Sequence, residues 1–549
     1  AQAGLGTVAG ATYVESGATL EQTSNNGQFA EPVYLEGDGV DGMGAYYASD
    51  DTAKKSPGLS GPVTLTGDAL LVGRRQWYLT SSNFNMGGHL LTLSNINHQC
   101  IFKPAKITEA GHILVPQGTI WVSHGANLNN GPEHTITLTN NSTMSVYGYK
   151  PLNAANWPIR YCTKNGGNSF YISSTSTAEP SHWYGPVEIP AGFTMRASLA
   201  TGDSDYAGHL FMGPIIGDGN FSVVNGNTLE SVKLYGTNTY TGTTSMPNSG
   251  MLWFMHRKAL PSLNPTKYTT PPNTGKMFLP LRADGSTETF VGWTADDLKE
   301  LYDAFDAASS GERLHPLLAR IESGETFTYP HDYDGTSHNY YCRQRYCGGG
   351  TVKLTGDFIG RPRLWLETDV DDGTVVEIDG AGEGRHNEYG RIDFYNGRFL
   401  LKNMAPWFTS EQDGLAKFDV AVRSTSPKSR VTFGPGASMG QELVRKTEAF
   451  DLVYNNGTCG TLELLDGCAS TNRLVAAYNA NQSAAVYQRG GDVYLTNGGS
   501  NDGHMGYGGY CFYEKTGGAM RIRAWTRFGF SHSGAGIFHG TSDWQSDGS

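Results

Sequence analysis

Apolar and polar residues alternate with a period of two through most of the chain, in short runs that end at Gly, Asn or Asp. Successive side chains of a β-strand point to opposite faces, so this alternation predicts many short strands with one buried face. Gly, Asn and Asp at the ends of the runs predict tight turns. The clearest runs are 62–72, 89–95, 134–148, 350–360, 365–380 and 391–403.

One short phrase recurs along the chain: an apolar residue, a polar or proline step, a glycine, a small or polar residue, then an aliphatic one. It is found at 14–20, 115–122, 187–197, 246–252 and 431–439. Glycine suits a position where the backbone must become left-handed or bend tightly, and the aliphatic residue after it then points inward. Each copy therefore predicts a strand, a turn and a second strand.

The spacing of the C-terminal copies predicts the architecture. Gly491 and Gly518 occupy the same place in two similar segments, and a third copy begins at Ile537. The interval between these copies is typical of one coil of a β-solenoid, in which each coil buries its inward side chains against its neighbours. We expect an all-β, right-handed parallel β-helix forming one elongated domain over residues 1–549. The third copy stops early, which favours a fragment of a longer chain or an end covered by head-to-tail self-association.

Residues 294–323 depart from the strand pattern. Their apolar residues are spaced i, i+3, i+4, i+7 in two sets: Leu298, Leu301, Tyr302 and Phe305, then Leu314, Leu317, Leu318 and Ile321. This spacing predicts a small helical hairpin within an excursion from the solenoid at 265–345. Thr294 and Asp297 resemble a capping box at its start. The hairpin either covers one side of the stack or contacts a ligand.

Composition and charge narrow the classes of function. Glycine makes up 72 of 549 residues, against a usual ~7%, and charged residues only 17%. The formal net charge of −12 argues against binding to nucleic acid or to an anionic membrane surface. The sequence contains no apolar run of the roughly 18 residues that a membrane-spanning helix requires.

The seven cysteines lack the spacing of zinc ligands. Cys342 and Cys347 flank RQRY, and Cys459 and Cys468 flank GTLELLDG. Each pair is close enough in sequence for a local disulfide if the protein is exported. In that case we expect Cys459 and Cys468 to be bridged. The alternative for both pairs is buried, reduced thiols.

Residues 217–252 resemble the autotransporter-associated β-strand repeat of bacterial surface passenger proteins. The residues that carry the resemblance are Gly217, Gly219, Val232, Leu234, the NTYTGTT segment at 238–244, Gly250 and Leu252. The resemblance implies a β-helical protein that is secreted or displayed on a bacterial cell surface, as an adhesin or stalk and in some cases as an enzyme. Such passengers normally precede a membrane barrel, and this sequence shows no barrel-like segment at its C-terminal end.

No residue of the sequence stands out as catalytic. Arg521-Ile522-Arg523 matches one element of polygalacturonase-type hydrolases, but their Gly-His-Gly is missing. Two clusters suggest a cation: Asp369, Asp371 and Asp372 beside Arg361 and Arg363, and the set His331, Asp332, Asp334 and His338. The first is more often a plain turn, since Gly373 stands where a calcium loop needs a ligand. The second is more often a solvated loop. We therefore assign no catalytic, cofactor-binding or metal-binding residue.

A further hypothesis is that aromatic side chains contact sugar rings. The candidates are Trp253, Trp293, Trp365, Trp407 and Trp525. Solenoid interiors also stack aromatic rings, so packing is the alternative for each. The sequence thus favours a secreted or surface β-solenoid that serves as an adhesin, stalk or extracellular structural component, with host or matrix glycans or surface proteins as partners and no cofactor. The rival hypothesis is a β-helical polysaccharide lyase or glycoside hydrolase.

Overall fold

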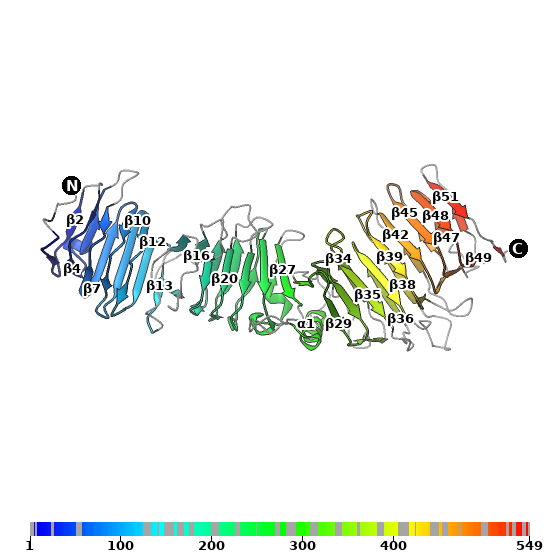
Figure 1. Ribbon diagram of the computed structural model, residues 1–549, viewed down its shortest axis with the longest axis horizontal. Helices are drawn as coiled ribbons and strands as arrows, with labels where there is room; N and C mark the ends of the chain where they lie inside the picture. Colours follow the sequence, from blue (N-terminus) through cyan, green and yellow to red (C-terminus); the bar gives the residue numbers. More distant parts are fainter. Residues whose placement is uncertain are drawn as a thin grey trace. The chain divides into compact units, whose positions relative to one another are not determined.

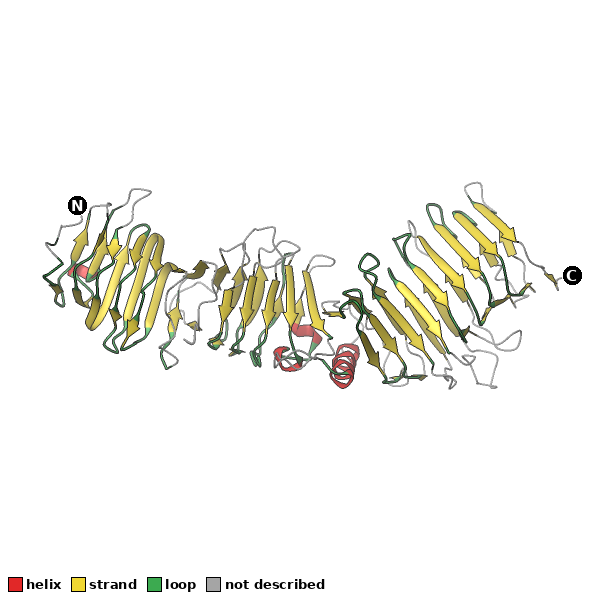
Figure 2. Ribbon diagram, viewed as in Figure 1, coloured by secondary structure: helices red, strands yellow, loops and turns green. Residues whose placement is uncertain are grey.

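Short parallel strands, stacked coil upon coil, dominate the computed structural model of the protein (Figures 1 and 2). The predicted parallel β-helix is confirmed. The chain divides into two compact units, Ala1–Phe278 and Leu279–Ser549, and a single domain over 1–549 stays a prediction. The structure describes residues 5, 8–23, 27–50, 57–123, 133–139, 142–147, 159–161, 169–174, 181–198, 208–224, 231–248, 250–269, 275–281, 293–307, 317–334, 343–359, 363–380, 389–403, 417–422, 424–439, 449–452, 459–471, 474–495, 503–522, 526–529, 534–540 and 545–546.

Strands of the first unit pair in parallel in columns. One column holds β1 (Thr12–Val14), β4 (Val33–Gly37), the start of β7 (Val63–Gly73), β9 (Phe84–Asn85) and β11 (Ile107–Thr108). The next holds β2 (Leu20–Gln22), β5 (Tyr46–Ala48), the end of β7, the starts of β10 (Leu91–Phe102) and β12 (Ile113–Ser123), β13 (Ile136–Leu138), β15 (Ile159–Tyr161), β18 (Val187–Glu188) and β21 (Ile215–Ile216).

A third column follows the corner after each of those strands. It holds β3 (Gln28–Phe29), β6 (Gly58–Leu59), β8 (Trp77–Leu79), the ends of β10 and β12, β14 (Thr143–Tyr147), β16 (Ser169–Ser174), β19 (Thr194–Ser198), β22 (Asn220–Val224), β24 (Thr244–Ser245) and β26 (Tyr268–Thr269). A further column holds β17 (Ser181–Trp183), β20 (Gly208–Phe211), β23 (Ser231–Leu234), β25 (Gly250–Phe254) and β27 (Gly275–Pro280). The 3₁₀ turns within the described residues are Val40–Gly42, Arg257–Ala259 and Pro265–Lys267.

The second unit repeats this plan. Its nine-strand column, so named for its described strands, holds β29 (Thr326–Tyr329), β32 (Thr351–Leu354), β35 (Val375–Asp379), β37 (Arg398–Lys402), β39 (Arg430–Phe433), β42 (Cys459–Leu464), β45 (Ser483–Gln488), β48 (Tyr510–Lys515) and β51 (Ala535–Gly540). Beside it run β28 (Leu317–Arg320), β31 (Arg343–Cys347), β34 (Arg363–Thr368), β36 (Tyr389–Phe394), β38 (Lys417–Val422), β41 (Ala449–Leu452), β44 (Leu474–Ala476), β47 (Gly503–Met505) and β50 (Thr526–Phe528).

The remaining strands of the second unit are short. They are β30 (Tyr333–Asp334) with β33 (Phe358–Ile359), and β40 (Ser438–Met439), β43 (Cys468–Thr471), β46 (Asp492–Leu495), β49 (Met520–Ile522) and β52 (Gln545–Ser546). Inward positions of the nine-strand column form a continuous apolar row through the core, made by Val352, Val376, Phe399, Val431 and Leu462. Each row member buries its neighbour, so the core runs along the stack, as the alternation predicts.

The recurrent glycine phrase forms the corners of the coils. In 187–197, β18 ends at Glu188, Gly192 has φ +83°, and β19 begins at Thr194. Gly118 turns β12 at φ +80°, and a Cβ there would lie 2.4 Å from the carbonyl oxygen of Asn95 in the preceding coil. Only glycine fits such a bend against a backbone neighbour. The strand–turn–strand prediction is confirmed.

The C-terminal period is also confirmed. Ser483 pairs with Tyr510, and Phe512 pairs with Ile537, so one coil has nearly the length that separates Gly491 from Gly518. The copy at Ile537 forms β51, which continues the column beside β48 (Figure 1).

One predicted helix is present and the other is wrong. Helix α1 (Ala295–Ala307) begins with the reciprocal capping box: Thr294 N donates to Asp297 Oδ2 at 2.9 Å, and Asp297 N donates to Thr294 Oγ1 at 3.2 Å. Leu317 and Leu318 of the second set instead lie in β28, which pairs in parallel with β31. Ile321 follows that strand, and Leu314 lies outside the described residues. A short apolar run cannot distinguish helix from buried strand, and here strand pairing decides.

Helix α1 covers the start of the second unit. Leu298 and Leu301 are buried, and the Tyr302 hydroxyl lies 3.0 Å from that of Tyr346 in β31. The ring of Tyr302 also packs on Tyr329 of β29, at 5.9 Å between centroids. The covering role predicted for this segment therefore has direct contacts. Among the helices that the structure describes, none has the length and apolar character to cross a bilayer.

Candidate functional site

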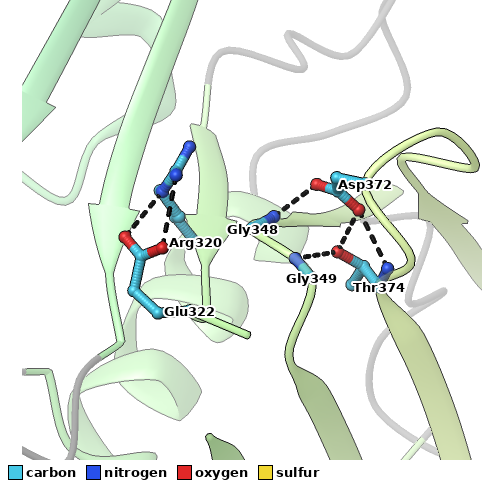
Figure 3. A network of polar contacts seen from close by, with 6 residues as sticks. All are labelled: Arg320, Glu322, Gly348, Gly349, Asp372 and Thr374. Atoms are coloured by element: carbon cyan, nitrogen blue, oxygen red, sulfur yellow. Dashed lines mark hydrogen bonds and ion pairs between the residues drawn. The ribbon is translucent and has the colours of Figure 1, made fainter. Parts of the chain in front are cut away.

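The acidic turn at 369–372 uses its carboxylates to hold the backbone. Asp372 accepts hydrogen bonds from the backbone nitrogen of Gly348 in the preceding coil, and from Thr374 N at 2.9 Å and Oγ1 at 2.6 Å (Figure 3). Asp369 Oδ1 accepts from Asp371 N at 3.0 Å. The plain turn, rather than a calcium loop, fits these contacts.

The other polar side chains at this corner also form structural contacts. Thr374 Oγ1 accepts from Gly349 N at 2.8 Å, and Arg320 forms a two-pronged pair with Glu322, from Nε at 2.8 Å and Nη2 at 3.2 Å (Figure 3). Hydrogen bonding to Glu322 raises the pKa of Arg320 above its usual value. Of the two arginines predicted beside the acidic turn, Arg361 lies outside the described residues, and Arg363 is placed only as the first residue of β34.

Two side chains of the histidine and aspartate cluster also form structural contacts. His331 Nε2 lies 2.8 Å from Asp296 Oδ1 of α1, and Asp332 Oδ1 accepts from Asp357 N at 2.7 Å. Asp334 ends the short strand β30, and His338 lies outside the described residues. In the part of the chain that the structure describes, no group of three or more His, Cys, Asp and Glu side chains is placed to hold a metal ion.

The tryptophan candidates differ in their surroundings. Trp293 is only 3% exposed and belongs to the core. Trp253 is half-buried and stacks on Phe278 of the next coil, at 4.3 Å between centroids. Trp365, also half-buried, meets Tyr395 at 5.9 Å. Trp407 and Trp525 lie outside the described residues. Packing accounts for these contacts, and sugar stacking stays a prediction.

The Arg-Ile-Arg segment is split between surface and core. Ile522 is buried in β49, and the Arg521 guanidinium lies over the ring of Tyr494 at 5.6 Å from its centroid. Arg523 lies outside the described residues.

The predicted Cys459–Cys468 bridge is not formed in this structure. Neither cysteine is part of a disulfide, nor is Cys347, and Cys342 lies outside the described residues. Cys459 begins β42 and Cys468 begins β43, the next strand around the corner. An extended strand rises ~3.3 Å per residue, so β42 alone is far longer than the ~4.4–6.8 Å that separates bridged Cα atoms.

We expect alkylation of the native protein to label Cys459 and Cys468 and to spare Cys100 and Cys511 until the protein is denatured. Thiolates are the reactive species, and burial raises the pKa of Cys511 to about 12 and that of Cys100 well above its ordinary value. Burial also raises the pKa of Cys459, but Cys459 and Cys468 are only half-buried, whereas Cys100 and Cys511 are buried. Mass spectrometry of labelled peptides measures each site separately. Labelling of Cys459 and Cys468 only after reduction would show that a bridge does form.

Charged side chains on the outer face of the nine-strand column form two ion-pair networks. In the first, Glu377 lies between Lys353, at 3.5 Å, and Lys402, at 2.9 Å, and Lys353 also lies 2.6 Å from Asp379. Hydrogen bonding to Asp379 raises the pKa of Lys353. These pairs link β32, β35 and β37 from coil to coil.

The second network covers the following coils. Glu463 of β42 lies 3.2 Å from Arg430 of β39 and 3.2 Å from Arg489. Arg489 in turn lies 3.9 Å from Glu514 of β48, which lies 3.8 Å from His539 of β51. From Arg430 to Glu514 the charges therefore alternate in sign along the stack.

Arg398 stands between the two networks. It is exposed at the start of β37, and its register partner in the next coil is another arginine, Arg430. No carboxylate among the described residues lies within ion-pair distance of its guanidinium. At the turn of Gly373, a Cβ would lie 4.0 Å from Arg398 Nη1. Like charges on neighbouring strands repel, so this position favours an anion.

A groove of about 610 Å³ opens at Arg398. Arg398, Arg430 and Lys428 supply positive charge, and Thr432 and Thr461 supply hydroxyl groups. Its apolar lining comes from β35 and β37 and from the turn before β39, through Val375, Phe399, Leu400 and Pro427. The groove combines cationic, hydroxyl and apolar groups in one concave surface, which is the usual make-up of a small-molecule site.

The turn that carries Lys428 is fixed against the preceding coil. Ser424 Oγ donates to Asn396 Oδ1 at 2.8 Å, and Gly397 N donates to Ser429 Oγ at 3.0 Å. Lys428 itself pairs with Asp371, two coils away. One wall of the groove is thus held by hydrogen bonds that cross from coil to coil.

Sequence reasoning missed Arg398 and its groove. The only signal is an arginine at the first position of two alternating runs, RFLLK and RVTF. The sequence does not show that these two runs pair. The register between coils does, and it places Arg398 beside Arg430 of the next coil.

Comparison with known proteins identifies no relative of this chain: no family model, no curated protein and no solved structure matches it. The resemblance of 217–252 to autotransporter-associated repeats therefore rests on its motif alone.

Proposed function

We propose that the protein is a secreted or surface-displayed β-solenoid that acts as an adhesive or structural component and contacts glycans. The observation that carries the proposal is the outer face of the nine-strand column. It presents charged groups in register over successive coils, with the groove at Arg398 between two ion-pair networks.

The energetics support a recognition role for this face. Exposed ion pairs contribute ~0–1 kcal/mol each to stability, which is small beside the buried apolar row beneath them. What the networks do provide is fixed side-chain geometry, since each carboxylate of Glu377 and Glu463 is held by two cations from different coils. An ordered polar array suits contact with a long polymer that runs across the coils.

The motif of residues 217–252 supports export to a bacterial surface. Its apolar residues Val232 and Leu234 lie buried in β23, and Leu252 lies buried in the paired strand β25. These are successive coils of the stack, as the passenger repeat implies. Head-to-tail self-association stays a prediction, which sizing over a concentration series would test.

Retention on a panel of immobilised polysaccharides tests the proposed function, with soluble products assayed in parallel. We expect the protein to be retained on at least one polymer and to release no reducing ends or unsaturated sugars. Sustained product formation would instead establish the rival lyase or hydrolase. Absence of retention on every polymer would contradict the adhesive role.

A further inference from the structure

We infer that the groove at Arg398 binds the carboxylate of an acidic polysaccharide, with a uronate residue as the group recognised. This inference rests on the proposed contact with glycans and names the class of glycan. Its starting point is the unusual position of Arg398: exposed, without a carboxylate partner in the described part of the chain, and adjacent in register to Arg430.

The charges around the groove favour one carboxylate in the groove over the several charges of a heavily sulfated sugar. Arg430 is held by Glu463 at 3.2 Å, and Lys428 is held by Asp371, so two of the three cations are already neutralised. Arg398 remains as the surplus positive charge. The acidic turn beside it has its Asp369 and Asp372 oxygens engaged with backbone groups, yet it still repels additional negative charge. A heavily sulfated chain or a nucleic acid would meet these carboxylates.

The guanidinium of Arg398 suits the carboxylate of a sugar acid. A planar guanidinium offers two parallel N–H donors to a carboxylate, which gives direction as well as charge. Arg430 lies on the adjacent strand, roughly 4.8 Å away in the hydrogen-bonding direction, but Glu463 already holds it at 3.2 Å, so Arg398 supplies the charge that pairs with the carboxylate.

The remaining lining suits a pyranose ring. Val375 and Leu400 lie on the outward face of neighbouring strands and are half-buried, so they offer apolar surface without filling the groove. Thr432 and Thr461 supply hydroxyl groups that can donate to or accept from sugar hydroxyls. Together with Arg398, these groups match a sugar that has an apolar face, several hydroxyls and one carboxylate.

Binding of polygalacturonate, measured by titration calorimetry or biolayer interferometry on the full chain, tests the inference. We expect wild-type protein to bind polygalacturonate and to lose most binding to its methyl-esterified form, in which the same backbone lacks the charge. Arg398→Gln should weaken binding by about tenfold or more, since a hydrogen bond between charged groups is lost. Arg398→Lys should retain part of the affinity, as a point charge without the planar fork.

Arg74→Gln is the matched control. Arg74 is an exposed arginine of the first unit, its substitution removes the same charge, and it belongs neither to the groove nor to the two ion-pair networks. We expect the affinity of this variant to equal that of the wild type, with melting temperatures of all variants unchanged. Equal losses in both variants, unchanged binding by Arg398→Gln, or tighter binding of heparin than of polygalacturonate would each overturn the inference. Retention on neutral polymers alone would overturn the uronate inference but leave the proposed function standing. Absence of retention on every polymer would refute both the inference and the proposed function.

Discussion

The Gly467→Ala variant is expected to unfold at a markedly lower temperature or denaturant concentration than the wild type. Gly467 has φ +79° at the corner between β42 and β43, where an alanine Cβ would lie 1.3 Å from the carbonyl oxygen of Ala437. That oxygen accepts from Cys468 N at 3.0 Å, so it cannot withdraw without loss of a bond between coils. A left-handed backbone costs ~1–2 kcal/mol for a residue with a Cβ, and overpacking adds ~1–3 kcal/mol or more.

Gly324→Ala separates these two contributions. Gly324 lies in the same unit with a similar φ of +86°, but a Cβ there would meet no atom within 4 Å. It should therefore incur only the cost of the backbone conformation. Thermal and denaturant unfolding, followed by circular dichroism, would compare the two variants. The quantity compared is the shift of the unfolding midpoint, because stacked coils need not unfold in a single two-state step. Similar shifts in both variants would contradict the predicted clash.

Most of the fold was predictable because the signals that specify it are local. Alternation of apolar and polar residues decides which face of a strand is buried, and a glycine such as Gly192 decides where the coil turns. The capping pair Thr294 and Asp297 likewise acts within one turn of helix. In each case the physical cause lies within a few residues of its effect, so the sequence displays it directly.

The wrongly predicted second helix has a non-local cause. Leu317 and Leu318 have helical spacing to their neighbours, but β28 gains its backbone hydrogen bonds from β31, which the sequence does not align with it. Cys459 and Cys468 are near in sequence, but an extended strand separates them and no disulfide joins them in this structure; a bridge in the exported protein stays a prediction. Proximity along a chain indicates proximity in space only where the chain turns back.

The groove was the least predictable feature, because it depends on the register between coils of unequal length. Arg398 pairs with Arg430, whereas Ser483 pairs with Tyr510, and the first of these intervals along the chain is the longer. Loops at the corners absorb the difference, so a fixed period does not align the two arginines. Only the register shows that Arg398 faces Arg430 and no carboxylate.

Asn238 lies in the motif that resembles passenger repeats, and the register between coils shows that it has a buried, structural role. Asn238 is only 4% exposed and bridges three coils: its Oδ1 accepts from Ile215 N at 2.8 Å in the preceding coil, and its Nδ2 donates to the carbonyl oxygen of Ala259 at 2.6 Å in the following one. Ile215 and Ala259 are both fully buried. Water therefore has no direct route to replace the lost partner at either end.

Asn238→Ala should accordingly destabilise the first unit by about 2–5 kcal/mol, since each buried group left unsatisfied costs ~1–3 kcal/mol. Asn220→Ala is the matched control: Asn220 also joins two coils, accepting from Thr243 N at 2.8 Å, but it is half-buried, so water can take its place at a cost of ~1 kcal/mol. Unfolding midpoints of the two variants, with hydrogen exchange at the Ile215 amide, give the comparison. Because the amide of Ile215 loses its acceptor in Asn238→Ala, its protection should fall there and persist in Asn220→Ala. Equal midpoints and equal protection would show that the bridge contributes no more than an ordinary surface hydrogen bond.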